Sequence, residues 1–214
     1  MIRVCCDSGA QLDPTLAARH GIDVVPLTVT VDGVAHLEGV SLDADRFWAR
    51  FDGGHVPAVS TAAPGPGQFL EAYEGLVAAG ATGIVSVHTG SEISATFDAA
   101  RLASEQIDVP VELVDTRSAS FVVGLATLAA AEHLAAGGTA ADAAGTAARV
   151  ATASGNVFVV RALALARAGG RLAGGTDDEA LPGSVPVLRL LHGEMSVIGQ
   201  AEGVEEAAAK MAAE

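Results

Sequence analysis

The chain has 214 residues, of which half are hydrophobic and only 4% aromatic, and its formal net charge at pH 7 is −14. So acidic a surface repels phosphate backbones, which argues against nucleic acid as a partner, although it allows transient contacts with other molecules. Apolar runs end well before the ~20 residues that a membrane span needs, so no transmembrane segment is expected.

Hydrophobic runs separated by glycine, proline and capping residues predict the elements of the first part of the chain. In chain order they are a strand at 2–6, a helix from 13–14 to 20, a strand at 23–31, a hairpin turn at 32–33 leading into 34–37, a short helix at 43–51, a helix at 66–79, a strand at 83–87, a helix at 94–106, a strand at 111–115, and two alanine-rich helices at 120–136 and 140–153. Alternating strands and helices favour a doubly wound, mostly parallel α/β sheet, forming a first domain over residues 1–153.

The pattern changes after residue 153. The elements expected there are a strand at 157–160, a short helix at 163–167, a turn at 169–171, a loop at 173–186, a hairpin made of 187–191 and 195–200, and a last helix at 204–213. These elements predict a second, smaller α/β domain over residues 154–214.

Cys5 and Cys6 lie side by side in the first predicted strand, where they would point to opposite faces. They are therefore poor disulfide partners and poor metal ligands. Met1 leads directly into this strand, so no signal peptide is expected. Two reduced thiols and no signal peptide predict a cytoplasmic protein.

Two segments rich in hydroxyl groups precede predicted helices. The first, 88–96, follows a strand and includes Ser91 and Ser94, and the second covers 59–69. A turn between a strand and a helix start offers free N–H groups and the positive end of the helix dipole, which together favour an anion. Neither segment has a Walker lysine or a complete GxGxxG motif, so ordinary nucleotide binding is not indicated. The alternative is that Ser91 or Ser94 simply caps a helix.

The sequence shows no pattern typical of catalysis or of a bound metal. His88 precedes Ser91 by three residues, but there is no GxSxG motif and no evident acid to orient the histidine, which argues against a hydrolase. The other histidines have no metal-ligand spacing and are expected in turns or at the surface. No metal and no cofactor are expected. Phe47 and Trp48 on the short helix are expected to pack into the core.

Six short motifs in the same order resemble the DegV family, whose members bind fatty acids and present them to a fatty acid kinase. They are Val4-Cys5-Cys6-Asp7-Ser8, Val25-Pro26-Leu27 with Asp32-Gly33, Thr61 with Pro64 and Phe69, Ser91-Glu92-Ile93-Ser94-Ala95-Thr96, Val114-Asp115-Thr116-Arg117-Ser118, and Phe158-Val159-Val160 with Gly169-Gly170-Arg171. The resemblance covers the whole chain.

The chain also departs from the family pattern. Ala62 and Ala63 replace a serine and a glutamine, Ala95 replaces a glycine, and His36-Leu37-Glu38-Gly39 replaces Tyr-x-Asp-Gly. It is also shorter than usual, without the closing segment whose histidine completes the family's carboxylate site. The resemblance therefore suggests a shortened member, or one from which this segment is missing.

The resemblance implies a long-chain fatty acid or acyl phosphate bound between two α/β domains, with the kinase doing the chemistry and this chain having no catalytic residues. It implies that Thr61, Ser94 and Arg171 hold the carboxylate, with Ser91 close by. Arg171 could instead interact with a helix C-terminus. Asp7 and Ser8 are further candidates at a strand end, where a purely structural turn is the alternative.

Two other functions stay open at this point. The chain could be an enzyme related to sugar kinases or phosphotransferases that acts on a small phosphorylated metabolite. Such an enzyme needs a phosphate-transfer histidine or a cluster of metal-binding carboxylates, and the sequence shows neither. The chain could also be a degenerate homologue without a ligand, which the alanines at 62 and 63 would allow.

Overall fold

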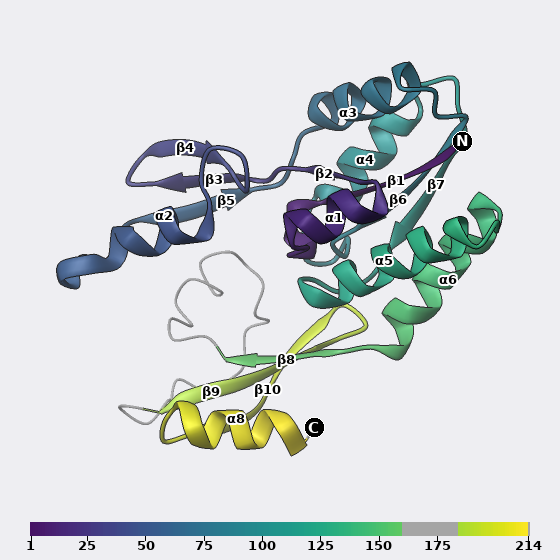
Figure 1. The fold of residues 1–214 in the computed structure, drawn as a ribbon. Coiled ribbons are helices and arrows are strands. Elements are labelled where there is room, and N and C mark those ends of the chain that lie inside the picture. Colours follow the sequence, from purple (N-terminus) through teal and green to yellow (C-terminus); the bar gives the residue numbers. More distant parts are fainter. Residues whose placement is uncertain (160–183, 214) are drawn as a thin grey trace.

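The computed structural model describes residues 1–159 and 184–213, and Figure 1 shows how its elements are arranged. Four parallel strands form the central sheet in the order β2-β1-β6-β7, with bounds β1 (Ile2–Asp7), β2 (Ile22–Val25), β6 (Gly83–His88) and β7 (Val111–Asp115). All of β6 and the last four residues of β1 are buried. Parallel strands covered on both faces have this character, and the predicted parallel α/β sheet is confirmed.

Helices cover the two faces of this sheet. One face carries α1 (Pro14–His20), α5 (Phe121–Ala135) and α6 (Ala140–Ala153), and the other carries α3 (Pro66–Ala78) and α4 (Thr96–Ser104). Cys6 packs into the first core and Cys5 into the second, which confirms that the two thiols point to opposite faces. Buried alanines at 126, 130, 143 and 147 allow α5 and α6 to lie close together.

The predicted strand at 23–31 is two strands in two sheets. β2 ends at Val25, and β3 (Thr28–Val31) lies in an antiparallel sheet of order β4-β3-β5. Pro26 stands between them, and proline has no N–H with which to continue a ladder. β4 (Val34–Leu37) pairs with β3 across Asp32 and Gly33, whose φ angles of 49° and 81° suit a two-residue hairpin turn.

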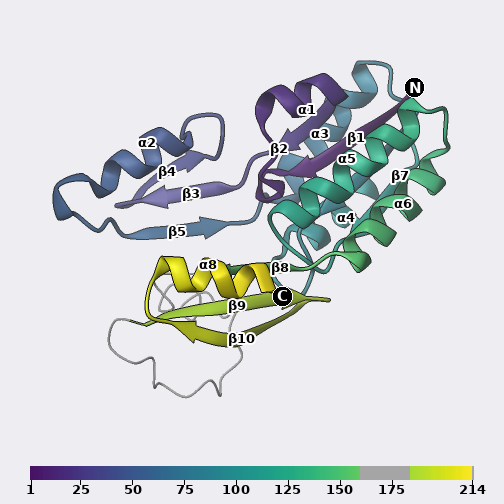
Figure 2. The same ribbon diagram turned by 60° about the horizontal axis from the view of Figure 1, so that its bottom comes forward.

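The hydroxyl-rich segment predicted as a turn at 59–69 begins instead as β5 (Val59–Ala62), antiparallel to β3. Since its partner strand is distant in sequence, no local turn or hairpin signal identifies it. The small sheet and α2 (Ala44–Trp48) extend to one side of the parallel sheet, as Figure 2 shows. A short 3-10 helix, η2 (Ala49–Gly54), follows α2.

Only one of the two aromatic residues on α2 packs against the small sheet. Phe47 contacts its core, as predicted, but Trp48 is 63% exposed, so the expectation of a core tryptophan is wrong. Consecutive residues of a helix point about 100° apart, and a helix of five residues packs on one side. Trp48 therefore faces away from the sheet that Phe47 contacts.

The last described part is an antiparallel sheet of order β10-β9-β8, with α8 against it (Figure 1). Its elements are β8 (Asn156–Val159), β9 (Val185–Leu191), β10 (Glu194–Ala201) and α8 (Val204–Ala213). The hairpin around His192 and Gly193 and the last helix are as predicted. The predicted loop at 173–186 is wrong at its end, because Val185 and Pro186 pair with β10.

The helix predicted at 163–167 and the turn at 169–171 lie outside the described residues. The division of the chain after residue 153 stays a prediction. Within residues 1–159 and 184–213, no helix combines the length and the apolar character that crossing a membrane requires.

Candidate functional site

The candidate site lies at the edge where the parallel strands end. β6 and β7 are in register with His88 opposite Asp115, so the loops that follow them start side by side. Ser8 follows β1, while Ser91 and Ser94 lie in the loop between β6 and α4. Open α/β sheets bind ligands at this edge, which makes these loops the candidate site.

Asp7, the last residue of β1, is fully buried and accepts four hydrogen bonds. Its carboxylate accepts from Thr89 N at 3.0 Å and Thr89 Oγ1 at 2.9 Å, from Gly9 N at 3.0 Å, and contacts His88 Nδ1 at 3.1 Å. Burial alone would raise the pKa of Asp7, but the hydrogen bonds from His88 and Thr89 outweigh it and hold the pKa below its usual value. The anionic Asp7 thereby joins the ends of β1 and β6.

His88 does have an acid that orients it, so the prediction that it lacks one is wrong. Asp7 lies on its Nδ1 side, and Ser86 Oγ lies 2.6 Å from its Nε2. The residue that faces His88 is thus Ser86 and not Ser91. This Asp-His-Ser arrangement is no open nucleophile site, because Ser86 is fully buried and its Oγ also contacts the Tyr73 hydroxyl at 2.8 Å. Sequence patterns gave no sign of the acid, since Asp7 ends β1 while Ser86 and His88 both lie on β6.

Ser8 is held between two elements. Its hydroxyl donates to Glu38 Oε2 at 2.6 Å and accepts from Leu27 N at 2.9 Å. These bonds connect the end of β1 to the segment that leads into and out of the small sheet. These two hydrogen bonds of Ser8 therefore fit the purely structural turn that was the alternative to ligand binding.

Ser91 is exposed and bound to the end of β7. Its Oγ donates to Asp115 Oδ2 at 2.6 Å, and its N–H donates to Asp115 Oδ1 at 3.2 Å. Ser94 is half-buried, and its Oγ lies 2.7 Å from Thr96 Oγ1 and accepts from Thr96 N at 3.3 Å. Neither serine is the N-cap of α4, a position that Ala95 holds: Ser94 accepts from the first residue of the helix, and Ser91 links two loops.

Gly90 is required where the loops after β6 and β7 meet. Its N–H donates to Ser118 O at 2.8 Å. A Cβ at this position would lie 2.7 Å from Arg117 Cα and 2.8 Å from Ser118 N, so a larger side chain would collide with backbone. The two loops thus pack backbone against backbone.

The C-terminal antiparallel sheet reaches the same edge. Asn156 Nδ2 donates to Ala119 O at 2.6 Å and to Ser118 Oγ at 3.1 Å. The hairpin turn of β9 and β10 also approaches closely, because a Cβ on Gly193 would lie 2.8 Å from Glu92 Oε2. Two of the segments that carry the candidate edge, the loops after β6 and β7, are therefore in contact with this sheet.

Thr61 lies on a strand of the small antiparallel sheet and not on the loops that follow the parallel strands. It is exposed on β5, opposite Val29 of β3, and no hydrogen bond of its hydroxyl occurs among the described residues. Arg171 lies outside the described residues. The structure thus places Asp7, Ser8, Ser91 and Ser94 on adjoining loops, while the convergence of Thr61, Ser94 and Arg171 stays a prediction.

The described part of the edge carries mostly negative charge. Glu38, Glu92 and Asp115 are exposed or half-buried, and Arg117 already pairs with Glu92 at 3.0 Å. An anionic ligand here would need a cation from elsewhere in the chain, which is the role that the resemblance assigns to Arg171. Within the described part of the chain, no group of three or more potential ligands could hold a metal ion.

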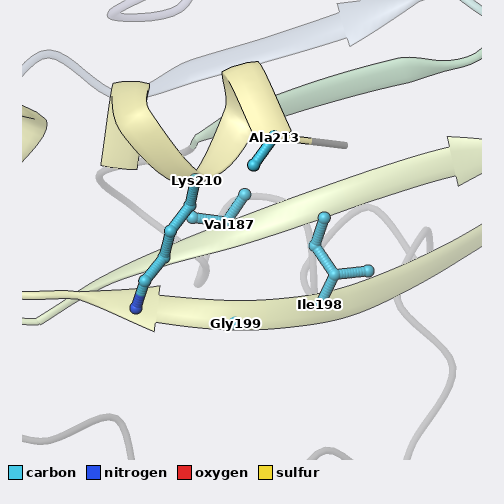
Figure 3. Close-up of a pocket in the computed structure, with 5 residues that line it drawn as sticks. All are labelled: Val187, Ile198, Gly199, Lys210 and Ala213. Atoms are coloured by element: carbon cyan, nitrogen blue, oxygen red, sulfur yellow. The ribbon is translucent and has the colours of Figure 1, made fainter. Parts of the chain in front are cut away.

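A shallow apolar pocket lies elsewhere, between α8 and the β9–β10 hairpin (Figure 3). It is lined by Val187, Ile198, Gly199, Lys210 and Ala213. None of the candidate residues that the structure describes lines it, so it is distinct from the edge of the parallel sheet.

Comparison with known proteins gives a consistent result. A family model described as "Uncharacterised protein, DegV family" matches residues 1–214. The chain is 36% identical over 214 residues to a DegV domain-containing protein of Streptomyces coelicolor, covering 98% of this chain and 74% of that protein. It is 31% identical over 216 residues to a DegV domain-containing protein of Deinococcus radiodurans, covering 99% of this chain and 75% of the relative.

A solved structure is similar as well. A DegV family protein from Thermus thermophilus, whose structure is described under the words "fatty acid binding", matches with a TM-score of 0.86 and 28% identity. The match covers 99% of this chain and 75% of that protein.

Proposed function

The chain belongs to the DegV family, and we propose from this membership that it binds a long-chain fatty acid, or the acyl phosphate made from it, and presents it to a fatty acid kinase. The observation that carries the proposal is the similarity of nearly the whole chain to the Thermus thermophilus protein, which is described as binding fatty acid. The ligand would lie between the domains at 1–153 and 154–214.

The tail and the carboxylate would contribute in different ways. Burying about fourteen methylenes at about 0.8 kcal/mol each yields about 11 kcal/mol before the costs of ordering the ligand. The head group would be held by Thr61, Ser94 and Arg171, with Ser91 close by and with Asp7 and Ser8 behind them. Ser94 supports this assignment because its hydroxyl lies at the start of α4, where N–H groups favour an anion.

We propose that the protein itself is not an enzyme. In the step expected of the kinase, a carboxylate oxygen of the fatty acid attacks the γ-phosphorus of ATP, and ADP leaves. The one Asp-His-Ser arrangement found in the described residues is fully buried, which supports a binding role over hydrolysis.

The presentation step is tested with purified protein, palmitate, radiolabelled ATP and a bacterial fatty acid kinase. We expect labelled palmitoyl phosphate only when this protein and the kinase are both present, because the kinase needs the presented carboxylate. Product formed by this protein and ATP alone would favour the phosphotransferase alternative. Binding of palmitate without any product in the complete mixture would contradict the kinase partnership while leaving fatty acid binding intact.

A further inference from the structure

Four buried side chains form one continuous chain of hydrogen bonds, for which fatty acid binding as proposed above has no direct use. Tyr73 Oη lies 2.8 Å from Ser86 Oγ, Ser86 Oγ lies 2.6 Å from His88 Nε2, and His88 Nδ1 lies 3.1 Å from Asp7 Oδ2. None of the four residues has any exposed surface. A buried network of this kind rigidifies its surroundings when every donor has an acceptor.

The chemistry of its two ends fixes the direction of each bond. Asp7 is an anionic acceptor, so His88 donates from Nδ1 and its Nε2 accepts from the Ser86 hydroxyl. Ser86 then accepts from Tyr73, whose pKa is raised by burial and which therefore keeps its proton. A neutral His88 thus satisfies all four side chains. A doubly protonated His88 would donate to Ser86, and the Tyr73 proton would lose its acceptor.

The network ends where the proposed ligand turn begins. Beyond His88, Asp7 accepts from both the N–H and the hydroxyl of Thr89, the first residue of the loop that carries Ser91 and Ser94. Asp7, at the end of β1, thus fixes the position of Thr89 by two hydrogen bonds, and His88 fixes Asp7 by a third.

The other end of the network lies on α3. Tyr73 comes from this helix, and so does Phe69, whose ring packs edge-on against the His88 ring with 4.9 Å between centroids. α3 follows β5, the strand that carries Thr61. The network therefore connects β6, which precedes the loop with Ser91 and Ser94, to α3, which follows the strand with Thr61.

We propose that His88 is a positioning residue: through Asp7 and Thr89 it sets the geometry of the turn that holds the ligand carboxylate. This inference rests on the proposed function. A ligand site is effective only when its contacting groups are themselves held by packing and hydrogen bonds behind them. A side chain that merely stabilised the fold would affect the binding of the tail and the head group alike.

The test compares two ligands of equal tail length, palmitate and hexadecan-1-ol, by titration calorimetry on the full chain. The ratio of their Kd values reports recognition of the carboxylate and is insensitive to general loosening of the tail site. In His88→Gln the amide no longer reaches Asp7 from the Nδ1 position. We expect the preference for palmitate to fall about tenfold, the size of effect seen when a residue that orients a metal ligand is lost. Hexadecanol should bind nearly as it does to the parent protein.

Matched variants separate positioning from folding. In His88→Asn the amide nitrogen takes the place of Nδ1 and can still donate to Asp7, so the palmitate preference should be largely retained. Thr127→Val removes another fully buried hydroxyl, which donates to Val123 O at 2.7 Å within α5, and should leave the preference unchanged. Should His88→Gln not fold, Thr89→Val gives the decision: it removes the hydroxyl that donates to Asp7 at 2.9 Å, at little change in volume, and its preference for palmitate should fall.

Equal loss of both ligands in His88→Gln, or an unchanged preference, overturns the positioning role. A parent protein that binds neither ligand, or that does not prefer palmitate, overturns the proposed carboxylate site itself and the positioning role with it. The two failures are thus distinguished by the parent titration alone.

Discussion

Asp7→Ala should lower the free energy of unfolding by about 3–5 kcal/mol, the cost of removing one partner from a buried pair. The substitution leaves His88 Nδ1, Gly9 N and both donors of Thr89 without their acceptor, and the His88 side chain has no exposed surface. Chemical denaturation monitored by circular dichroism measures the change. Asp23→Asn is the matched control: Asp23 is partly exposed in neighbouring β2 and pairs with Arg3 at 3.0 Å. Its loss should cost at most about 1 kcal/mol.

Loss of the Asp7 carboxylate should also change how stability depends on pH. The folded pKa of Asp7 lies below the value of about 3.9 expected in the unfolded chain. The stabilisation that the ionised Asp7 gives the folded state is therefore fully present above the pKa of the unfolded chain. It is lost as the pH falls through the folded pKa. Asp7→Asn should flatten the stability curve in this acidic range relative to the parent and to Asp23→Asn. Parallel curves for all three proteins would contradict the account of Asp7.

Arg171→Ala should weaken palmitate binding about ten- to hundredfold, because one charge-assisted hydrogen bond is worth about 1.5–3 kcal/mol. The expectation is reinforced by the charge of the described edge, where Arg117 already pairs with Glu92. Titration of palmitate against the parent and the variant measures the effect. Thr61→Ala and Ser94→Ala, which remove neutral donors, should have smaller effects.

Arg149→Ala serves as the control for loss of positive charge, since Arg149 is exposed on α6 and donates from Nη2 to Thr146 Oγ1 at 2.9 Å on the same helix. It should bind palmitate as the parent does. If Arg171→Ala, Thr61→Ala and Ser94→Ala all bind like the parent, the tail alone holds the ligand and the proposed carboxylate site is wrong.

Most elements of the fold could be predicted because their signals are local. The two-residue turn at Asp32 and Gly33 and the glycines after α5 mark chain reversals by their conformational freedom. The alanine-rich helices α5 and α6 keep the helical spacing of buried residues, so they were recognisable in spite of their low complexity. Pro26 shows the limit of this reasoning. The alternation of apolar and polar residues continues across it, but the hydrogen bonds between strands cannot, because proline has no N–H.

The contacts of the candidate site could be predicted only in part. Neighbouring ends of parallel strands were expected, and the structure brings the loops with Ser8 and Ser91 to one edge. The pairing of Asp7 with His88 joins residues 81 positions apart, and it depends on the order and register of β1 and β6. Neither order nor register has a signature in a single buried strand, so the acid that orients His88 was missed.

The most direct test of the central claim is denaturing extraction of the purified protein followed by lipid mass spectrometry, with uptake of added palmitate and oleate measured on the same preparation. Ligand binding through a buried aliphatic tail predicts a C14–C18 fatty acid in the extract, or stoichiometric uptake of palmitate or oleate by protein purified without one. A preparation that yields no acyl species and takes up neither fatty acid would contradict fatty acid binding by this chain and would favour a homologue that has lost its ligand.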